Sequence, residues 1–267
     1  GRLSTILESH LYADSRARGI AHTAILVGGT AVLGGFVEHR ARTRGARILV
    51  TAIATWIVLG GRSLEREAVA AARRRVTHLV GRDTESLDAS EVSRAVIESV
   101  AENTSDAVVA PLFWGAVAGL PGLLGYRAVN TLDAMVGHHN ARYERFGWAS
   151  ARLDDLVNLP GSRLAGLLTI AACPSRARDP WRAWRRDADG HPSPNGGVVE
   201  AAFAGALGIQ LGGTNRYYGN RLEHRAIMGD GRPPRAGDIP TANRLARRVG
   251  LGAATIAGCC AYVIRWP

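Results

Sequence analysis

Residues 107–126, which read AVVAPLFWGAVAGLPGLLGY, decide the fold class because twenty residues in a row carry no charge. A helix that crosses the hydrocarbon core of a bilayer needs about 20 predominantly apolar residues, and this stretch is that long. Pro121 lies in its second half between Gly119 and Gly122. Proline removes one helical hydrogen bond and clashes with the preceding turn. We therefore predict that residues 107–133 form two half-helices with a break between them, and not one straight span.

Long apolar segments recur along the chain on both sides of this stretch. They cover residues 20–37, 48–61, 198–214 and 249–264, in which Glu200 is the one charged residue. Arginines gather between the segments, as they do in the loops of membrane proteins. The pattern predicts an all-α, polytopic helical membrane protein with four to six spans, broken or re-entrant helices and polar helical loops.

The composition narrows the function classes and the domain organisation. All 33 basic residues are arginine, and the net charge is +10. A phosphate-binding P-loop and a Schiff-base enzyme are excluded, because both need a lysine. The basic segments lack the interleaved aromatic residues of nucleic-acid-binding modules, so we expect no nucleic-acid partner. We predict one domain over residues 1–267, with a polar amphipathic helical insert at 62–106 and a polar loop at 174–197.

A helix predicted to start near Asp88 carries the first group of candidate site residues. Helical spacing places five charged residues within about a third of its circumference. They are Glu91, Arg94, Glu98, Glu102 and Asp106. Such a stripe usually faces solvent, but this one continues into apolar residues, with Asn103 and Asp106 at the border. Polar groups at a membrane border favour a functional site.

Two further polar stretches follow the long apolar segment. In the first, Tyr126, Asn130 and Asp133 share one helix face, and asparagine and aspartate oxygens at that spacing suit Mg²⁺. In the second, Asp154 and Asp155 point about 100° apart on a helix, so one can face a site while the other pairs with an arginine. Ordinary polar groups at helix ends remain the alternative explanation.

The fourth polar stretch is a loop rich in proline and glycine at residues 189–197. It leads into a helix of small residues through Asn195, a predicted N-cap. Backbone N–H groups at such a helix start bind phosphate well, and an ordinary capped turn is the alternative. We predict a phosphate or nucleotide loop at 191–200 that opens onto the same cavity as Asp106.

These stretches together resemble the CobD/CbiB family, the integral-membrane cobinamide synthases of cobalamin biosynthesis. The motifs that carry the resemblance are Gly81-Arg-Asp-Thr, Glu98 to Asp106, Ala110-Pro-Leu-Phe-Trp, Tyr126 to Asp133, Phe146 to Asp155, His191-Pro-Ser-Pro-Asn195 and Leu207 to Gly213. They cover nearly the whole chain in order. The family's N-terminal Gly-Asp-Pro and His-Pro-Val elements are absent, so we expect the family's N-terminal segment to be missing here. Residues 158–163 also depart from the family's usual Asn-Leu-Ile-Pro-Ala-Arg.

The resemblance implies an amide-forming synthase that depends on ATP and Mg²⁺. It would join aminopropanol, or its phosphate, to a propionate carboxylate of adenosylcobyric acid in the cytoplasmic membrane, with the active site facing the cytoplasm. The implied partners besides these substrates are membrane lipid, a second copy of the chain or other membrane-bound enzymes of the cobalamin pathway. The residues expected in catalysis are Glu98, Glu102, Asp106, Asp133 and Asp154, and all of these except Glu98 are also expected to bind the metal. The residues expected to hold substrate are Arg82, Asp83, Asn103, Arg127, Asn130, Arg152, His191 and Asn195.

Two other function classes fit parts of the pattern. A UbiA-like prenyltransferase is also a helical membrane enzyme with Asn and Asp motifs for Mg²⁺-diphosphate, but its full paired motif is absent here. A non-enzymatic, AmpE-like membrane regulator would need none of these polar motifs. ATP-dependent consumption of cobyric acid separates the three classes.

Overall fold

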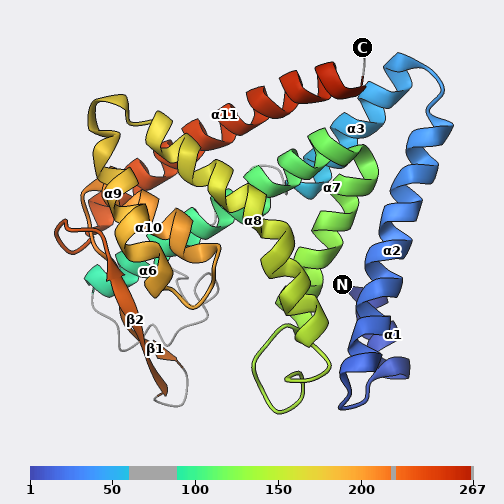
Figure 1. The fold of residues 1–267 in the computed structure, drawn as a ribbon, viewed down its shortest axis with the longest axis horizontal. Helices are drawn as coiled ribbons and strands as arrows, with labels where there is room; N and C mark the ends of the chain where they lie inside the picture. Colours follow the sequence, from blue (N-terminus) through green and yellow to red (C-terminus); the bar gives the residue numbers. More distant parts are fainter. Residues whose placement is uncertain (60–88, 218–220, 266–267) are drawn as a thin grey trace. The chain divides into compact units, whose positions relative to one another are not determined.

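The computed structural model describes residues 1–59, 89–217 and 221–265. The chain divides into two compact units, one of Gly1–Leu59, Ala110–Asn158 and Ile256–Pro267, the other of Gly60–Val109 and Leu159–Thr255. Among the described residues, helices dominate both units and one two-stranded sheet is present, so the all-α class is confirmed apart from that sheet (Figure 1). The substrate-binding candidates Arg82 and Asp83, and much of the predicted insert at 62–106, lie outside the described residues.

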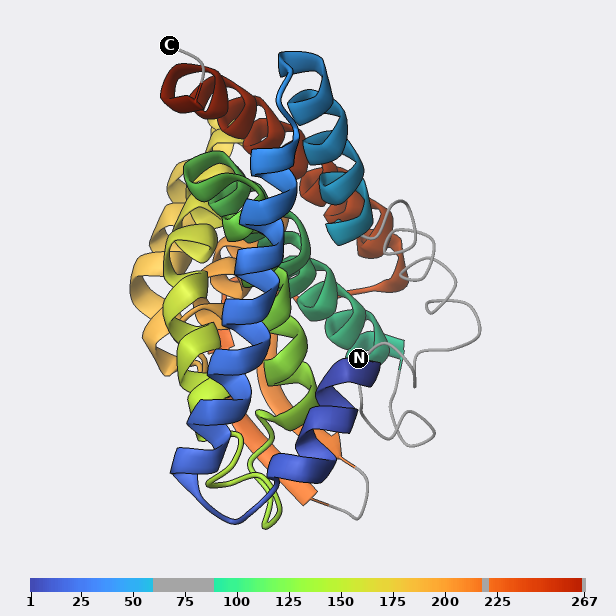
Figure 2. The same cartoon turned by 90° about the vertical axis from the view of Figure 1, so that its right-hand side faces the viewer.

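In the first unit, two helices pack against a third, which lies at its centre. Its elements are α1 (Arg2–Leu11), α2 (Arg16–Arg40), α3 (Arg44–Val58), α7 (Ala110–Val136), the start of α8 (Trp148–Ala171) and the end of α11 (Ile239–Arg265). Both α2 and α3 pack against α7, and α2 runs alongside α7 in both views (Figures 1 and 2). The buried side chains Val58, Leu120 and Leu123 form the contact between α3 and α7.

Helix α7 is broken where the sequence predicts it. Gly119 has φ 64° and ψ −147°, which interrupts the helix two residues before Pro121. The chain turns back there, because a Cβ added to Gly115 would lie 3.6 Å from the Cβ of Leu123. In a straight helix, residues eight apart are separated by about 12 Å. The prediction of two half-helices is therefore confirmed.

Helix α2 supplies the partner for the backbone group that the break exposes. The N–H of Leu120 donates to Oε2 of Glu38 at 3.1 Å, so a carboxylate caps the start of the second half-helix. Gly34 permits this approach, since a Cβ there would lie 2.9 Å from the backbone of Leu120 and Pro121. The break is thus held from outside by α2.

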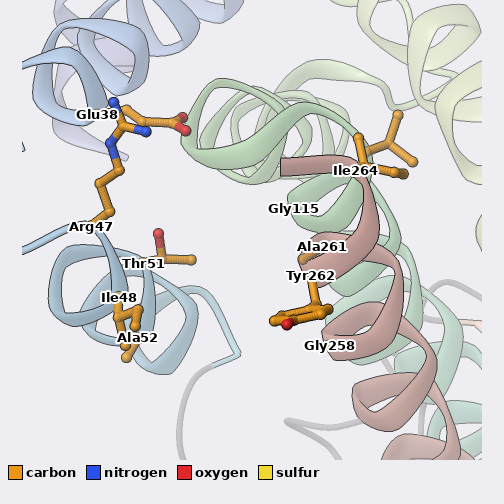
Figure 3. A pocket seen from close by; sticks show the side chains of 11 residues that line it. Glu38, Arg47, Ile48, Thr51, Ala52, Gly115, Gly258, Ala261, Tyr262 and Ile264 are labelled. Carbon is orange, nitrogen blue, oxygen red and sulfur yellow. The ribbon is translucent and has the colours of Figure 1, made fainter. Parts of the chain in front are cut away.

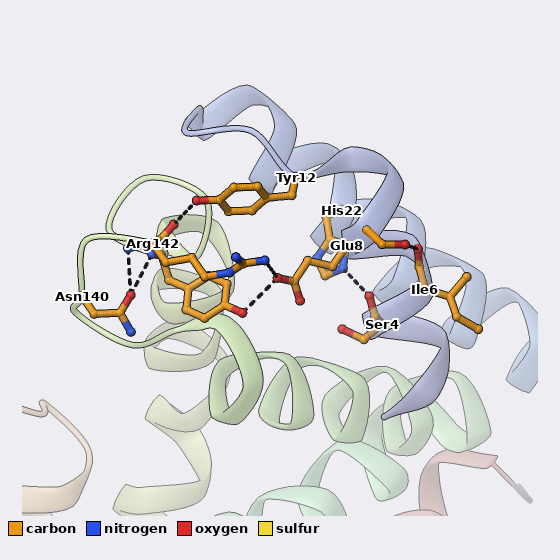
Figure 4. Close-up of polar contacts among 9 residues, drawn as sticks. Ser4, Ile6, Glu8, Tyr12, His22, Asn140 and Arg142 are labelled. Atoms are coloured by element: carbon orange, nitrogen blue, oxygen red, sulfur yellow. Dashed lines mark hydrogen bonds and ion pairs between the residues drawn. The ribbon is translucent and has the colours of Figure 1, made fainter.

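A polar network fixes α1 against the loop that follows α7 (Figure 4). Glu8 accepts hydrogen bonds from Arg142 Nη2 at 3.0 Å and from Tyr143 Oη at 2.9 Å. Tyr12 donates to the backbone carbonyl of Arg142 at 3.0 Å, and the Arg142 guanidinium lies 4.3 Å from the centre of the Tyr12 ring. Glu8 is buried, so these bonds compensate its loss of water.

The second unit combines helices with a β-hairpin. Its elements are α6 (Ala89–Asn103), the π-helix η2 (Thr104–Val109), the rest of α8, the 3₁₀ turns η3 (Pro174–Arg176), η4 (Ala188–Gly190) and η5 (Ala236–Asp238), α9 (Arg178–Asp187), α10 (Gly196–Leu207), β1 (Leu211–Tyr217), β2 (Arg221–Met228) and most of α11. Strands β1 and β2 pair antiparallel, with a bulge between Leu211 and Gly213. Gly212 and Gly213 have φ of 78° and 86°, which other residues rarely adopt.

Two sequence expectations are wrong in this unit. Residues 174–197 are not one loop, because α9 occupies 178–187. Residues 198–214 do not form a span, because α10 ends at Leu207, Gly208 adopts a left-handed conformation, and β1 follows. The chain stops the helix there because glycine takes φ 66° without steric cost.

Two helices of the described chain are long and apolar enough to cross a membrane. They are Arg16–Arg40 and the continuous stretch Ala89–Val136, which contains the break at Gly119. Large apolar side chains are also exposed on α3 and at the end of α11, among them Trp56 at 71% and Val263 at 71%. Membrane association is thus weakly supported, and the expected four to six spans are not confirmed.

Candidate functional site

Glu102, His191 and Glu200 meet in the second unit, although up to 98 positions separate them in the chain. Each offers one ligand atom, and the three atoms lie within 4.8 Å of one another. The side chains of His191 and Glu200 are only 2% and 0% exposed, and Nε2 of His191 lies 3.4 Å from Oε1 of Glu200. Two carboxylates and an imidazole held this closely, with Glu102 half-buried and the other two buried, form a candidate site for a divalent cation.

The surroundings of His191 favour its neutral form. Burial lowers the pKa of His191, and the nearby positive charge of Arg225 lowers it further. Nη1 of Arg225 lies 3.2 Å from Nε2. On the other side of the ring, Nδ1 lies 3.0 Å from the Ser193 N–H, which donates to it, and 3.2 Å from the Ser193 carbonyl. Nε2 thus lies close to both Arg225 and Glu200.

Helix α6 carries Glu98 and Glu102, and it is bonded to the β-hairpin. Glu98 lies one turn before Glu102 and is 3% exposed. Its Oε1 accepts a hydrogen bond from the N–H of Gly212 at 2.8 Å. Arg94, one turn earlier, donates to the carbonyl groups of Gly212 and Thr214. The charged stripe of α6 therefore holds the hairpin and the cluster, which excludes the alternative of a wholly solvated face.

The start of α10 lies against the cluster, but its N–H groups already have acceptors. A Cβ on Gly196 would lie 2.9 Å from Cε1 of His191 and 3.3 Å from Oε1 of Glu102. Ser193 Oγ accepts from the N–H of Gly196 at 3.1 Å and from that of Asn195 at 3.3 Å. Asn195 occupies the N-cap position without capping by its side chain. Phosphate binding by these N–H groups would have to displace Ser193.

Asn195 instead ties the loop to α8. Its Oδ1 accepts from Arg163 Nη1 at 2.7 Å and from Ser162 Oγ at 2.8 Å. Asn195 is 5% exposed, so this carbonyl oxygen has little access to water. Asn195 therefore anchors the 191–197 loop, and Arg163 bonds directly to it.

A second polar set lies in the first unit. Tyr126 Oη donates to Oδ1 of Asn158 at 2.7 Å, and Nδ2 of Asn158 donates to Oδ2 of Asp154 at 2.8 Å. Asp155 lies 3.9 Å from Nη1 of Arg152 instead. The expected pairing of one of these carboxylates with an arginine is present, and the expectation that Asp154 faces a site stays a prediction.

The remaining candidates lie near these two sets. Asn103 donates to the carbonyl of Ser99 at 2.8 Å, and Asp106 lies half-buried on the π-helix η2. In the first unit, Arg127 donates to Oδ1 of Asn130 at 3.3 Å, and Asp133 interacts electrostatically with Asp155. A single metal bound by Asp106 and Asp133 stays a prediction.

Sequence reasoning missed Glu200 and Arg225. Glu200 is the lone charge of an apolar segment, which was a usable signal because such charges are costly unless they serve a site. Arg225 gave no such signal, since its place beside His191 depends on the pairing of β1 with β2.

Comparison with known proteins gives a consistent result. The family model described as CobD/Cbib protein matches residues 1–246. A protein of Mycobacterium tuberculosis named cobalamin biosynthesis protein CobD is 47% identical, over 98% of this chain and 88% of its own length. Proteins of the same name from Rhodobacter capsulatus and Geobacter metallireducens are 43% and 44% identical, over 93% and 85% of this chain and 82% and 77% of their own lengths. No solved structure matches. With nearly its whole length matched at this identity, the chain belongs to the CobD/CbiB family.

Proposed function

We propose that the protein joins aminopropanol, or its phosphate, to a propionate carboxylate of adenosylcobyric acid, with ATP as the energy source and Mg²⁺ as the metal. Family membership makes the chain an enzyme of cobalamin biosynthesis. The observation that carries the finer proposal is the largely buried cluster of Glu102, His191 and Glu200. Two carboxylates suit Mg²⁺, whereas an imidazole is a more usual ligand of transition metals, so the set fits a divalent cation in general.

The reaction balances without any other reactant. A carboxylate oxygen of the corrinoid attacks the γ-phosphorus of ATP, the bond to ADP breaks, and an acyl phosphate forms. The amine nitrogen then attacks the acyl carbon, phosphate leaves, and the ammonium proton passes to a base. A divalent ion at the cluster would neutralise charge on the ATP phosphates.

The chain's own residues supply the other requirements. Arginines replace the absent lysine as phosphate ligands, and Arg163 and Arg225 are the candidates beside the cluster and its loop. A carboxylate within hydrogen-bonding reach of the ammonium group would take its proton. Asp106, Asp133 and Asp154 stay our candidates for this role or for metal binding. We further propose a multi-pass location in the cytoplasmic membrane, with the site facing the cytoplasm.

The test is turnover by the purified protein in proteoliposomes with adenosylcobyric acid, ATP, Mg²⁺ and either amine. We expect the corrinoid to be converted to its amide with release of one phosphate per product, measured by mass spectrometry and phosphate assay. Glu102→Gln and Glu200→Gln should abolish turnover, while Glu144→Gln, which changes an exposed carboxylate, should not. Unchanged corrinoid with the wild-type protein, or amide formation without ATP, would contradict the proposal.

A further inference from the structure

A groove of about 740 Å³ lies within the first unit, between α3 and the end of α11, with the first half of α7 also contributing to its lining. Figure 3 shows Ile48 and Ala52 on one side and Tyr262 and Ile264 on the other. These side chains are apolar apart from the tyrosine hydroxyl, and Tyr262 and Ile264 are 59% and 56% exposed. The groove is therefore open to its surroundings along an apolar surface.

Arg47 and Glu38 line one end of the groove, and the segment that holds them carries more positive than negative charge. The Arg47 side chain extends toward Glu38 (Figure 3). Nε of Arg47 donates to the carbonyl of Ala41 at 3.0 Å, so the guanidinium has a fixed direction. The segment 38–47 holds four arginines and one glutamate. Four arginines against one glutamate give this segment a net positive charge.

The position of this charged end matches the depth of lipid headgroups. Helix α2 is long and apolar enough to cross a bilayer, and it ends at Arg40. The turn to α3 follows at once, so Arg47 and the other arginines lie where such a helix leaves the hydrocarbon. Basic pockets between membrane helices bind anionic headgroups, and an apolar groove beside them accepts an acyl chain.

We propose that this groove binds one anionic phospholipid, with its phosphate on Arg47 and an acyl chain between α3 and α11. The inference rests on the membrane location proposed above, but not on the reaction. A zwitterionic lipid has the same tail, so the headgroup contact predicts a preference for phosphatidylglycerol over phosphatidylcholine.

The test is lipid binding to the detergent-purified full chain, measured by native mass spectrometry with phosphatidylglycerol and phosphatidylcholine of identical acyl chains. Arg47→Gln should weaken phosphatidylglycerol binding about fivefold, the effect of one basic residue near a lipid surface, and should leave phosphatidylcholine unchanged. Its control is Arg18→Gln, an exposed arginine at the other end of α2, which should change neither lipid.

A second variant tests the tail of the lipid. Gly258 lines the groove, and a Cβ there meets no atom within 4 Å, so Gly258→Phe fills the groove without a backbone clash. It should weaken both lipids, whereas Gly28→Phe, at an equally open position on α2, should weaken neither. Equal binding of the two lipids by the wild type, or binding that neither Arg47→Gln nor Gly258→Phe reduces, would overturn the proposal. No substrate is present, so the outcome is independent of the proposed reaction.

Discussion

Replacing Gly119 by alanine tests the break in α7 directly. Gly119 has φ 64° and ψ −147°, a combination open essentially to glycine alone. Holding another residue there costs about 1–3 kcal/mol. Alanine also reduces the freedom of the unfolded chain, which offsets about 0.4–1 kcal/mol of this. We expect Gly119→Ala to be less stable by about 1–2 kcal/mol.

The control is Gly28→Ala in the middle of α2. Gly28 has helical geometry, and a Cβ there meets nothing within 4 Å. Alanine in a helix interior is favoured over glycine by about 0.5–1 kcal/mol, so this variant should gain stability. The two glycine-to-alanine changes should therefore shift stability in opposite directions.

Thermal unfolding of the detergent-solubilised proteins, followed by circular dichroism, measures both changes. One kcal/mol corresponds to a Tm shift of about 2–4 °C for a domain of this size. We expect a lower Tm for Gly119→Ala and a higher one for Gly28→Ala. If Gly119→Ala matched the control, residue 119 would have ordinary helical angles, and the turn between the half-helices would be refuted.

Three further predictions concern other parts of the chain. Glu38→Ala should lower the free energy of unfolding by about 1 kcal/mol, because it removes the cap on the Leu120 N–H. Glu38→Gln keeps an acceptor and should lose less stability. Equal Tm values for the two variants would contradict this capping role. Arg232 donates to Asp238 and holds the pKa of that carboxyl below its usual range, so the pair stabilises the fold above about pH 4 and the contribution fades as the pH falls. Asp238→Asn should therefore lower Tm at pH 7, and its difference from the wild type should shrink as the pH falls below about 4. A difference that stays constant down to low pH would count against the pair. Asp106→Asn should reduce turnover on the order of 10²-fold or more without altering the amount of protein in membranes, and near-normal rates would remove Asp106 from the site.

The sequence by itself determined the features that depend on neighbouring residues. Gly119 and Pro121 disfavour a continuous helix whatever the helix packs against, because the energetic cost of helical geometry arises in their own backbone. The spacing of Glu98 and Glu102 fixed their common face on α6, and both take part in the polar interior of the second unit. The ordered motifs also carried the family resemblance, which the match over residues 1–246 confirms.

Only the tertiary structure decided which residues meet. Glu102, His191 and Glu200 converge through the packing of α6, the loop at 191–197 and α10, and no local period encodes a distance between such segments. The β-hairpin was not predicted from the sequence for the same reason: β1 and β2 form their hydrogen bonds with each other and not with their neighbours within each strand. Leu120 likewise obtains its cap from Glu38, 82 positions away, because folding alone brings α2 to the break.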